Sequence, residues 1–99
     1  MIVYSRATKD MKIKDATWIQ GGIGYVKGKP AEEIVVGDII VWNGGYTSTV
    51  LKKLYETKST ITFEISGSDA YYDANKTYER KFGKKRIVAI DNLKEDRSL

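Results

Sequence analysis

The chain has 99 residues, of which 41% are hydrophobic and 30% charged, as is typical of a single globular domain. It contains no cysteine and no histidine, which excludes disulfides, thiolate nucleophiles, cysteine-ligated zinc and the usual general base. No apolar segment approaches the ~20 residues that cross a bilayer, and the start lacks a secretory signal pattern. We therefore expect a cytoplasmic protein with no membrane partner, no enzyme activity, no cofactor and no metal site.

The first third of the chain predicts short strands separated by glycine. Residues 1–14 alternate only weakly and fit an edge strand, a short helix or an N-terminal arm. Residues 16–19 and 23–26 are extended and rich in apolar side chains, and the glycines between them tolerate the positive φ of a turn. Residues 27–30 are expected to interrupt the second of these strands. We assign residues 15–91 to a single β-barrel domain and residues 92–99 to a charged C-terminal tail.

The middle of the chain contains the strongest local signals. Residues 30–34 begin with proline and continue with two acids, which predicts a short helical turn. Residues 39–42 form a continuous β-favouring run, and Asn43-Gly44-Gly45 supplies the left-handed backbone positions of a tight hairpin. The return strand spans residues 47–55, and we expect it to bend where two lysines interrupt its apolar pattern.

The C-terminal half alternates in the manner of half-buried strands. Residues 60–65 alternate strictly, residues 66–75 read as a long loop, residues 76–82 alternate again, and residues 86–90 form a closing strand. Short strands, glycine-rich turns and almost no helical period predict an all-β fold. Our first choice is a small antiparallel SH3-like barrel of five to six strands with a short helical turn near residues 30–34, and an OB-type barrel is the second.

The segment from residue 76 to residue 86 contains six basic residues and one acid, Glu79, and we call it the basic strip. Its local net charge is +5, whereas the net charge of the whole chain is +4. The basic residues are Lys76, Arg80, Lys81, Lys84, Lys85 and Arg86. Alternation places Arg80 on one face with Tyr78 and Phe82. Because phosphate contacts come chiefly from Lys and Arg, we predict that Arg80, Lys81, Lys84, Lys85 and Arg86 bind a phosphate-bearing ligand. The alternative is that the lysines only solubilise a hairpin and protect a sheet edge.

Tyrosines and a glycine-rich loop add candidates to this site. Tyr46, Tyr71 and Tyr72 lie in or beside predicted loops, where they can stack on bases, or alternatively pack on the rim of the barrel. Lys27 and Lys29 accompany a glycine-rich segment whose amides can hold a phosphate, although the spacing of a Walker motif is absent. The alternative for those glycines is a role in turns and bulges.

A resemblance to known proteins is carried by AEEIVVGDIIVWN at residues 31–43, GYTSTV at 45–50, YERKF at 78–82 and RIVAI at 86–90. Across residues 17–90 the chain resembles a group of small uncharacterised proteins of bacteriophages and prophages. The VGDII segment is also similar to Hint and intein domains, whose chemistry needs a histidine that this chain lacks, and to ASCH and PUA-like RNA-binding barrels. The phage resemblance implies an accessory protein that binds nucleic acid, binds a host protein or sequesters a nucleotide signal of bacterial immunity.

The leading interpretation is a non-enzymatic binding protein for a phosphate-bearing ligand. That ligand is either a nucleotide immune signal, sequestered as an anti-defence function, or a nucleic acid. The alternative is a protein-interaction module that docks on a host enzyme or a virion component. We also expect a homo-oligomer in which residues 1–14 cross to a neighbouring subunit and help to build a ligand site between subunits.

Overall fold

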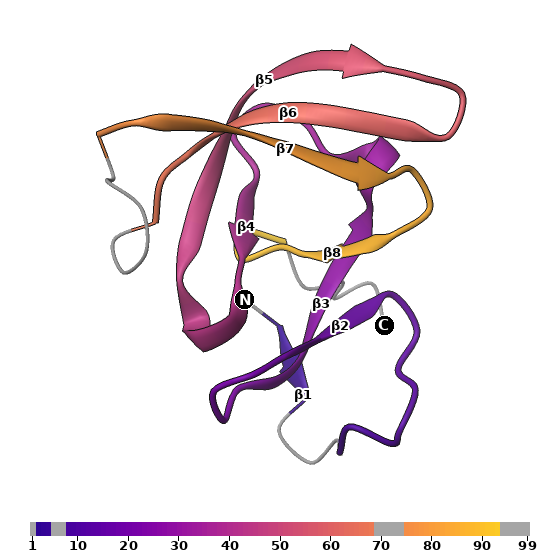
Figure 1. Ribbon diagram of the computed structural model, residues 1–99. Helices are drawn as coiled ribbons and strands as arrows, with labels where there is room; N and C mark the ends of the chain where they lie inside the picture. The colour runs from indigo at the N-terminus through magenta and orange to yellow at the C-terminus, as the bar shows by residue number, and fades with distance from the viewer. Residues whose placement is uncertain (1, 5–7, 69–74, 94–99) are drawn as a thin grey trace.

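The computed structural model describes residues 2–4, 8–68 and 75–93, and this part of the chain folds into eight antiparallel strands with two short 3₁₀ turns (Figure 1). The strands are β1 (Val3–Tyr4), β2 (Ala16–Ile19), β3 (Gly24–Pro30), β4 (Ile39–Val41), β5 (Thr47–Glu56), β6 (Thr60–Ser66), β7 (Thr77–Gly83) and β8 (Ile87–Ala89). The 3₁₀ turns are η1 (Ala31–Glu33) and η2 (Asn43–Gly45). No helix within these residues is long and apolar enough to span a bilayer.

The strands form two sheets that together make a curled half-barrel. β4, β5, β6 and β7 follow one another as consecutive hairpins, and β3 pairs with β1, β2 and β8. In Figure 1 β6 and β7 lie at the top, β1 and β2 at the bottom, and β4 and β8 between them. A bridge between Ile40 and Ile90 joins the two sheets where β4 passes the end of β8. The predicted all-β class and small barrel are confirmed, and the 3₁₀ turn η1 lies inside the predicted residues 30–34.

The strand count is higher than the five to six predicted. β8 lies within the closing strand predicted at residues 86–90, whereas β1 spans only two residues and is too short to show a period. β1 pairs with Tyr25 and Val26 of β3 in the same chain, so the strand interpretation of residues 1–14 holds for Val3 and Tyr4. The oligomeric state and the crossing of this segment to a neighbour stay predictions.

The expected interruption at residues 27–30 is wrong, because β3 continues without a break to Pro30. Lys29 and Pro30 pair with Val88 and Ile87 of β8. Gly28 makes this possible, since a Cβ atom at that position would overlap the carbonyl oxygen of Val88. The glycine therefore marks a close approach of two backbones and not the end of a strand.

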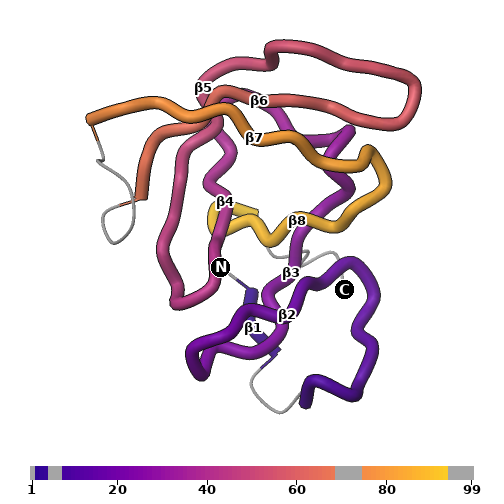
Figure 2. Tube along the Cα trace, viewed as in Figure 1, coloured from indigo at the N-terminus to yellow at the C-terminus, as the bar shows by residue number. Residues whose placement is uncertain are grey.

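β5 is long and irregular, as the two lysines in its sequence predict. Its pairing with β6 shifts register between Val50 and Lys52 and again between Lys53 and Tyr55. Such shifts bend a strand and increase its twist. Figure 2 shows β5 rising from the η2 turn and then bending toward the β5–β6 hairpin, which curls the sheet.

The main core lies inside the curled sheet. Its fully buried members include Ile40, Val50, Ile61, Phe63 and Phe82, each at most 2% exposed. Full burial of such a side chain contributes about 1.5–3 kcal/mol, so this cluster supplies much of the driving force for folding. A smaller cluster is buried between β2, β3 and the ends of β4 and β8, and consists of Ile19, Val26, Val41 and Ala89.

The two sheets also meet at their turns. The N–H of Gly44 donates to the carbonyl of Gln20 at 2.8 Å, and the N–H of Gln20 donates to Oδ1 of Asn43 at 3.0 Å. Gly21 and Gly44 both have positive φ, and a Cβ on Gly21 would lie only 3.0 Å from the Cα of Gly44. This contact fixes the η2 turn. Asn43 in this turn and Trp42 directly before it belong to the functional site described next.

Candidate functional site

A cleft of about 560 Å³ opens on the concave face of the β4–β7 sheet, and we call it the Trp42 cleft. Its walls come from the end of β4 and the η2 turn, the start of β5, the end of β6 and the middle of β7. The lining residues are Trp42, Asn43, Ser48, Ile65, Ser66, Ser68, Tyr78, Glu79 and Arg80. The lining combines a cation, a carboxylate, three serines and two aromatic rings, as in a site for a small polar ligand with a planar part.

Trp42 organises the centre of this cleft. Its indole Nε1–H donates to Oγ of Ser48 at 2.9 Å, and its ring stacks on Phe82 with centroids 6.3 Å apart and planes inclined by 13°. The guanidinium carbon of Arg80 lies 5.2 Å from the centroid of the Trp42 ring. A cation held over an aromatic face uses the ring and not its own N–H groups, so the donors of Arg80 remain available to a ligand.

Arg80 occupies the position on β7 that its alternation predicts. It shares the concave face with Tyr78 and Phe82, and its side chain emerges at the rim instead of being buried. No carboxylate within the described ranges 2–4, 8–68 and 75–93 forms an ion pair with it. Arg80 therefore brings to the cleft a positive charge that no ion pair engages within these ranges, while the carboxylate of Glu79, which also lines the cleft, accepts the hydroxyl of Tyr55.

A second hollow lies on the other face of β7, and we call it the threonine groove. It encloses about 410 Å³ and is lined by Tyr55, Thr57, Thr60, Thr62, Glu79 and Lys81. The hydroxyl of Tyr55 donates to Oε1 of Glu79 at 3.2 Å, and this hydrogen bond together with the carboxylate charge raises the pKa of Tyr55. Lys81 lines this groove while Arg80 lines the cleft, because successive side chains of a strand point to opposite faces.

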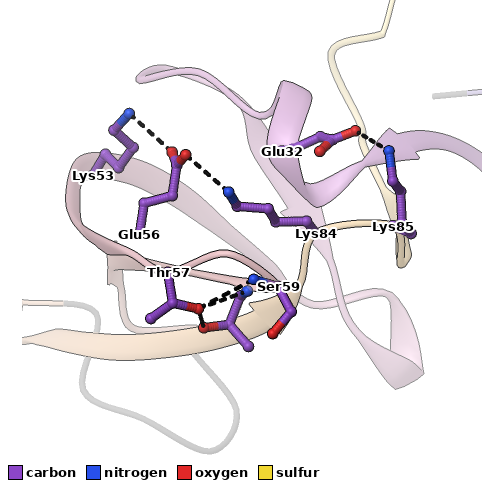
Figure 3. A network of polar contacts seen from close by, with 8 residues as sticks. Glu32, Lys53, Glu56, Thr57, Ser59, Lys84 and Lys85 are labelled. Atoms are coloured by element: carbon purple, nitrogen blue, oxygen red, sulfur yellow. Dashed lines mark hydrogen bonds and ion pairs between the residues drawn. The ribbon is translucent and has the colours of Figure 1, made fainter.

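Lys84 and Lys85 of the basic strip lie at the hairpin tips and pair with acids. Lys84 contacts Glu56 at 3.0 Å and Lys85 contacts Glu32 at 2.9 Å, while Lys53 reaches the other oxygen of Glu56 at 3.3 Å (Figure 3). The hydrogen bonds and charges of Lys84 and Lys53 lower the pKa of Glu56.

Figure 3 also shows the turn formed by Thr57 and Ser59 next to this hairpin-tip network, which consists of Glu32, Lys53, Glu56, Lys84 and Lys85. Arg86 lies over the ring of Phe82, with its guanidinium carbon 5.8 Å from the centroid. The structure thus divides the predicted ligand residues Arg80, Lys81, Lys84, Lys85 and Arg86 among separate surroundings, and only Arg80 lines the Trp42 cleft.

The other predicted site residues have varied positions. Nζ of Lys29 lies 2.6 Å from Oδ2 of the buried Asp38, which also accepts the N–H of Val35 at 3.0 Å, so Lys29 is engaged within the fold. Lys27 is half-buried on β3, and Tyr46 is 37% exposed directly after the η2 turn. Tyr71 and Tyr72 lie outside the described residues.

Sequence reasoning missed most of the cleft lining. Trp42, which also packs against the main core, and the hydroxyl side chains of Ser48, Ser66 and Ser68 are not among the predicted ligand residues. One signal was present, because Ser48 shares the inward face of β5 with Val50 and places a polar group where an apolar one is expected.

Comparisons with known proteins identify no relative. No protein-family model matches the chain, and neither a curated protein nor a solved structure shows a significant match to it. Within the part of the chain that the structure describes, no cluster of three or more acidic, histidine or cysteine side chains is arranged to hold a metal ion. The resemblance to phage proteins therefore stays a prediction, and the function must be argued from the cleft.

Proposed function

We propose that this protein is a non-enzymatic binding protein whose ligand carries a phosphate group, and that the ligand binds in the Trp42 cleft. The observation that supports the proposal is the position of Arg80, whose guanidinium lies over Trp42 without a carboxylate partner among the described residues. A planar guanidinium matches two phosphate oxygens with parallel N–H donors, and such charge-assisted pairs are the strongest hydrogen bonds in proteins.

The surroundings of Arg80 favour this chemistry. Stacking on Trp42 limits the rotamers of the arginine, so less conformational entropy is lost when a ligand binds. The aromatic rings of Trp42 and Tyr78 and the side chain of Ile65 supply an apolar wall next to the cation. A ligand with a phosphate beside a flat ring, such as a nucleotide or an unstacked base of a nucleic acid, fits this combination.

The biological context of the proposal comes from the resemblance to phage proteins. In that context a small binding protein in the host cytoplasm acts either by sequestering a nucleotide immune signal, which is an anti-defence function, or by holding nucleic acid. Both functions require recognition of phosphate and neither requires bond cleavage.

Fluorescence of Trp42 provides a direct test. The chain has two tryptophans, and Trp18 packs edge-on against Tyr25 in the other sheet, so Trp18→Phe leaves Trp42 as the only indole reporter. This protein is titrated with nucleoside monophosphates, cyclic dinucleotides and single-stranded oligonucleotides.

We expect at least one of these ligands to give a saturable signal that Arg80→Ala weakens tenfold or more. Lys81→Ala is the matched control, because it removes a neighbouring cation from the opposite face and should leave the affinity unchanged. Equal effects of the two substitutions, or no saturable signal from any ligand, would contradict the proposal.

A second candidate function, a protein-interaction module, is favoured by a separate observation. Val35 and Val36 are 58% and 64% exposed in the turn before β4, and Leu51 on β5 is 42% exposed. The N–H of Gly37 donates to the carbonyl of Val50 at 2.8 Å, which holds this apolar turn against β5. A stoichiometric host protein that co-purifies through nuclease treatment and high salt, and that Val36→Lys releases, would favour this function.

A further inference from the structure

The number of cations that reach the Trp42 cleft restricts the kind of phosphate ligand. A nucleic acid strand is held by a series of Lys and Arg contacts along its backbone, which release counterions as they form. The basic strip does not provide such a series among the residues that line the Trp42 cleft. Lys84 and Lys85 are paired with Glu56 and Glu32, and Lys81 lies in the threonine groove beside Glu79. Arg80 is the one cation among the lining residues of the cleft.

The size of the cleft leads to the same restriction. Its volume of about 560 Å³ lies within the range of roughly 300–1,000 Å³ that is usual for small-molecule sites. The cleft is bounded on one side by the η2 turn, which the contact between Gln20 and Asn43 fixes in place. A ligand of one or two nucleotides fills such a space, whereas a nucleic acid strand needs a groove that continues beyond the cleft.

Ser68 supplies a second polar contact for a ligand. It is only 3% exposed and lines the cleft, and its hydroxyl has no hydrogen-bond partner within the described part of the chain. Among the described residues, every fully buried side-chain nitrogen or oxygen atom has a hydrogen-bond partner. The Ser68 oxygen, which has none among these residues, is therefore accessible from the cleft. A buried hydroxyl with an unused donor, lining the same cleft as a guanidinium that has no ion-pair partner among the described residues, is an arrangement that a phosphate completes.

We infer that the ligand is a small free nucleotide, of one or two bases, whose phosphate is held by Arg80 and Ser68 while its base lies against Tyr78 and Ile65. The inference rests on the proposed function and narrows it, because it selects a small nucleotide over a nucleic acid strand. Arg80 recognises the phosphate through its N–H edge, Ser68 donates one further hydrogen bond, and the apolar wall covers the base.

Salt dependence separates the two kinds of ligand. The Trp18→Phe protein is titrated with four nucleoside 5′-monophosphates, a panel of cyclic dinucleotides, inorganic phosphate and a twelve-base single strand, at 50 and 200 mM salt. For a single phosphate contact we expect the affinity to fall about threefold or less across this range, whereas four or more contacts on a strand reduce it about fiftyfold or more. We expect at least one small nucleotide to saturate with the shallow dependence and to bind more tightly than inorganic phosphate.

Variants locate the nucleotide in the cleft. Arg80→Ala and Ser68→Ala should each weaken it tenfold or more, while Lys81→Ala leaves it unchanged, and circular dichroism melts verify that each variant is folded. A nucleotide affinity that neither Arg80→Ala nor Ser68→Ala changes would overturn the inference. A strand that binds more tightly than every nucleotide, with a steep salt dependence, would overturn it and leave the proposed function standing. Absence of binding by every phosphate compound would instead remove the proposed function itself.

Discussion

Two parts of one basic strip, the cation in the Trp42 cleft and the lysines at the hairpin tips, use positive charge in different ways. At the tips, Lys84 and Lys85 each contact an acid from a distant part of the chain. In the cleft, Arg80 contacts an aromatic ring and keeps its donors free of carboxylates among the described residues. Charge that is already paired contributes to holding hairpins together, whereas charge that is oriented but unpaired is available for a ligand.

Phe82 underlies both regions, so its removal should have the largest effect. Its ring stacks on Trp42 on the cleft side, lies beneath Arg86 near the tips and is 2% exposed. We expect Phe82→Ala to lower the free energy of unfolding by about 3–5 kcal/mol, because it leaves a cavity in the core. Urea denaturation monitored by circular dichroism measures this loss. A loss below 1 kcal/mol would show that the two regions do not depend on a common support.

Ser48 distinguishes the Trp42 cleft from the hairpin tips, because its side chain lines the cleft and accepts the hydrogen bond of Trp42 Nε1–H. We expect Ser48→Ala to cost about 1 kcal/mol of stability, since it leaves a half-buried indole N–H without its partner. It should also weaken ligand binding, because Trp42 then no longer orients Arg80. Thr49→Ala on the same strand is the control, as the structure uses the backbone and not the side chain of Thr49 in its bond to Ser66. Unchanged ligand affinity in Ser48→Ala would contradict this role.

The pH dependence of stability should separate the hairpin tips from the threonine groove by smaller effects at opposite ends of the pH scale. The pKa of Glu56 is lowered in the folded state, so its contribution is present above the unfolded pKa and is lost as the pH falls through the folded value. The pKa of Tyr55 is raised, so its contribution is present below the unfolded pKa and is lost as the pH rises through the folded value.

Thermal melts across pH measure both contributions. Lys84→Met should flatten the acid side only, because it removes the main partner of Glu56, and Tyr55→Phe should flatten the alkaline side only. If Lys84→Met changed the alkaline side as well, the tip network and the threonine groove would not be independent.

The local features of the fold could be predicted from sequence, whereas the division of charge could not. The hairpin turn at Asn43-Gly44-Gly45 and the buried Ile61, Phe63 and Ile65 follow from neighbouring residues, because turn geometry and strand period are local properties. The ion pair between Lys85 and Glu32 joins residues separated by 53 positions, and no local pattern specifies it. The basic strip could therefore be identified from the sequence. The sequence did not show which of its residues form ion pairs with acids.

Gly28 and Ser68 show the same limit for single residues. Glycine in a strand and glycine in a turn look alike until the opposing backbone is placed, and in this chain that backbone belongs to Val88. Ser68 follows a strand in a polar segment, which ordinarily indicates an exposed loop, yet it is buried against the cleft. Only tertiary packing distinguishes these cases.

The contact between the two glycine turns has a consequence for how the sequence can vary. Surface turns ordinarily accept insertions at little thermodynamic cost. Here the Gln20–Gly21 turn and the η2 turn hydrogen-bond each other, and a Cβ on Gly21 would lie only 3.0 Å from the backbone of Gly44. A change of length in one turn therefore requires a compensating change in the other, and we expect related sequences to keep the lengths of both turns constant while the exposed turn at Thr57–Ser59 varies.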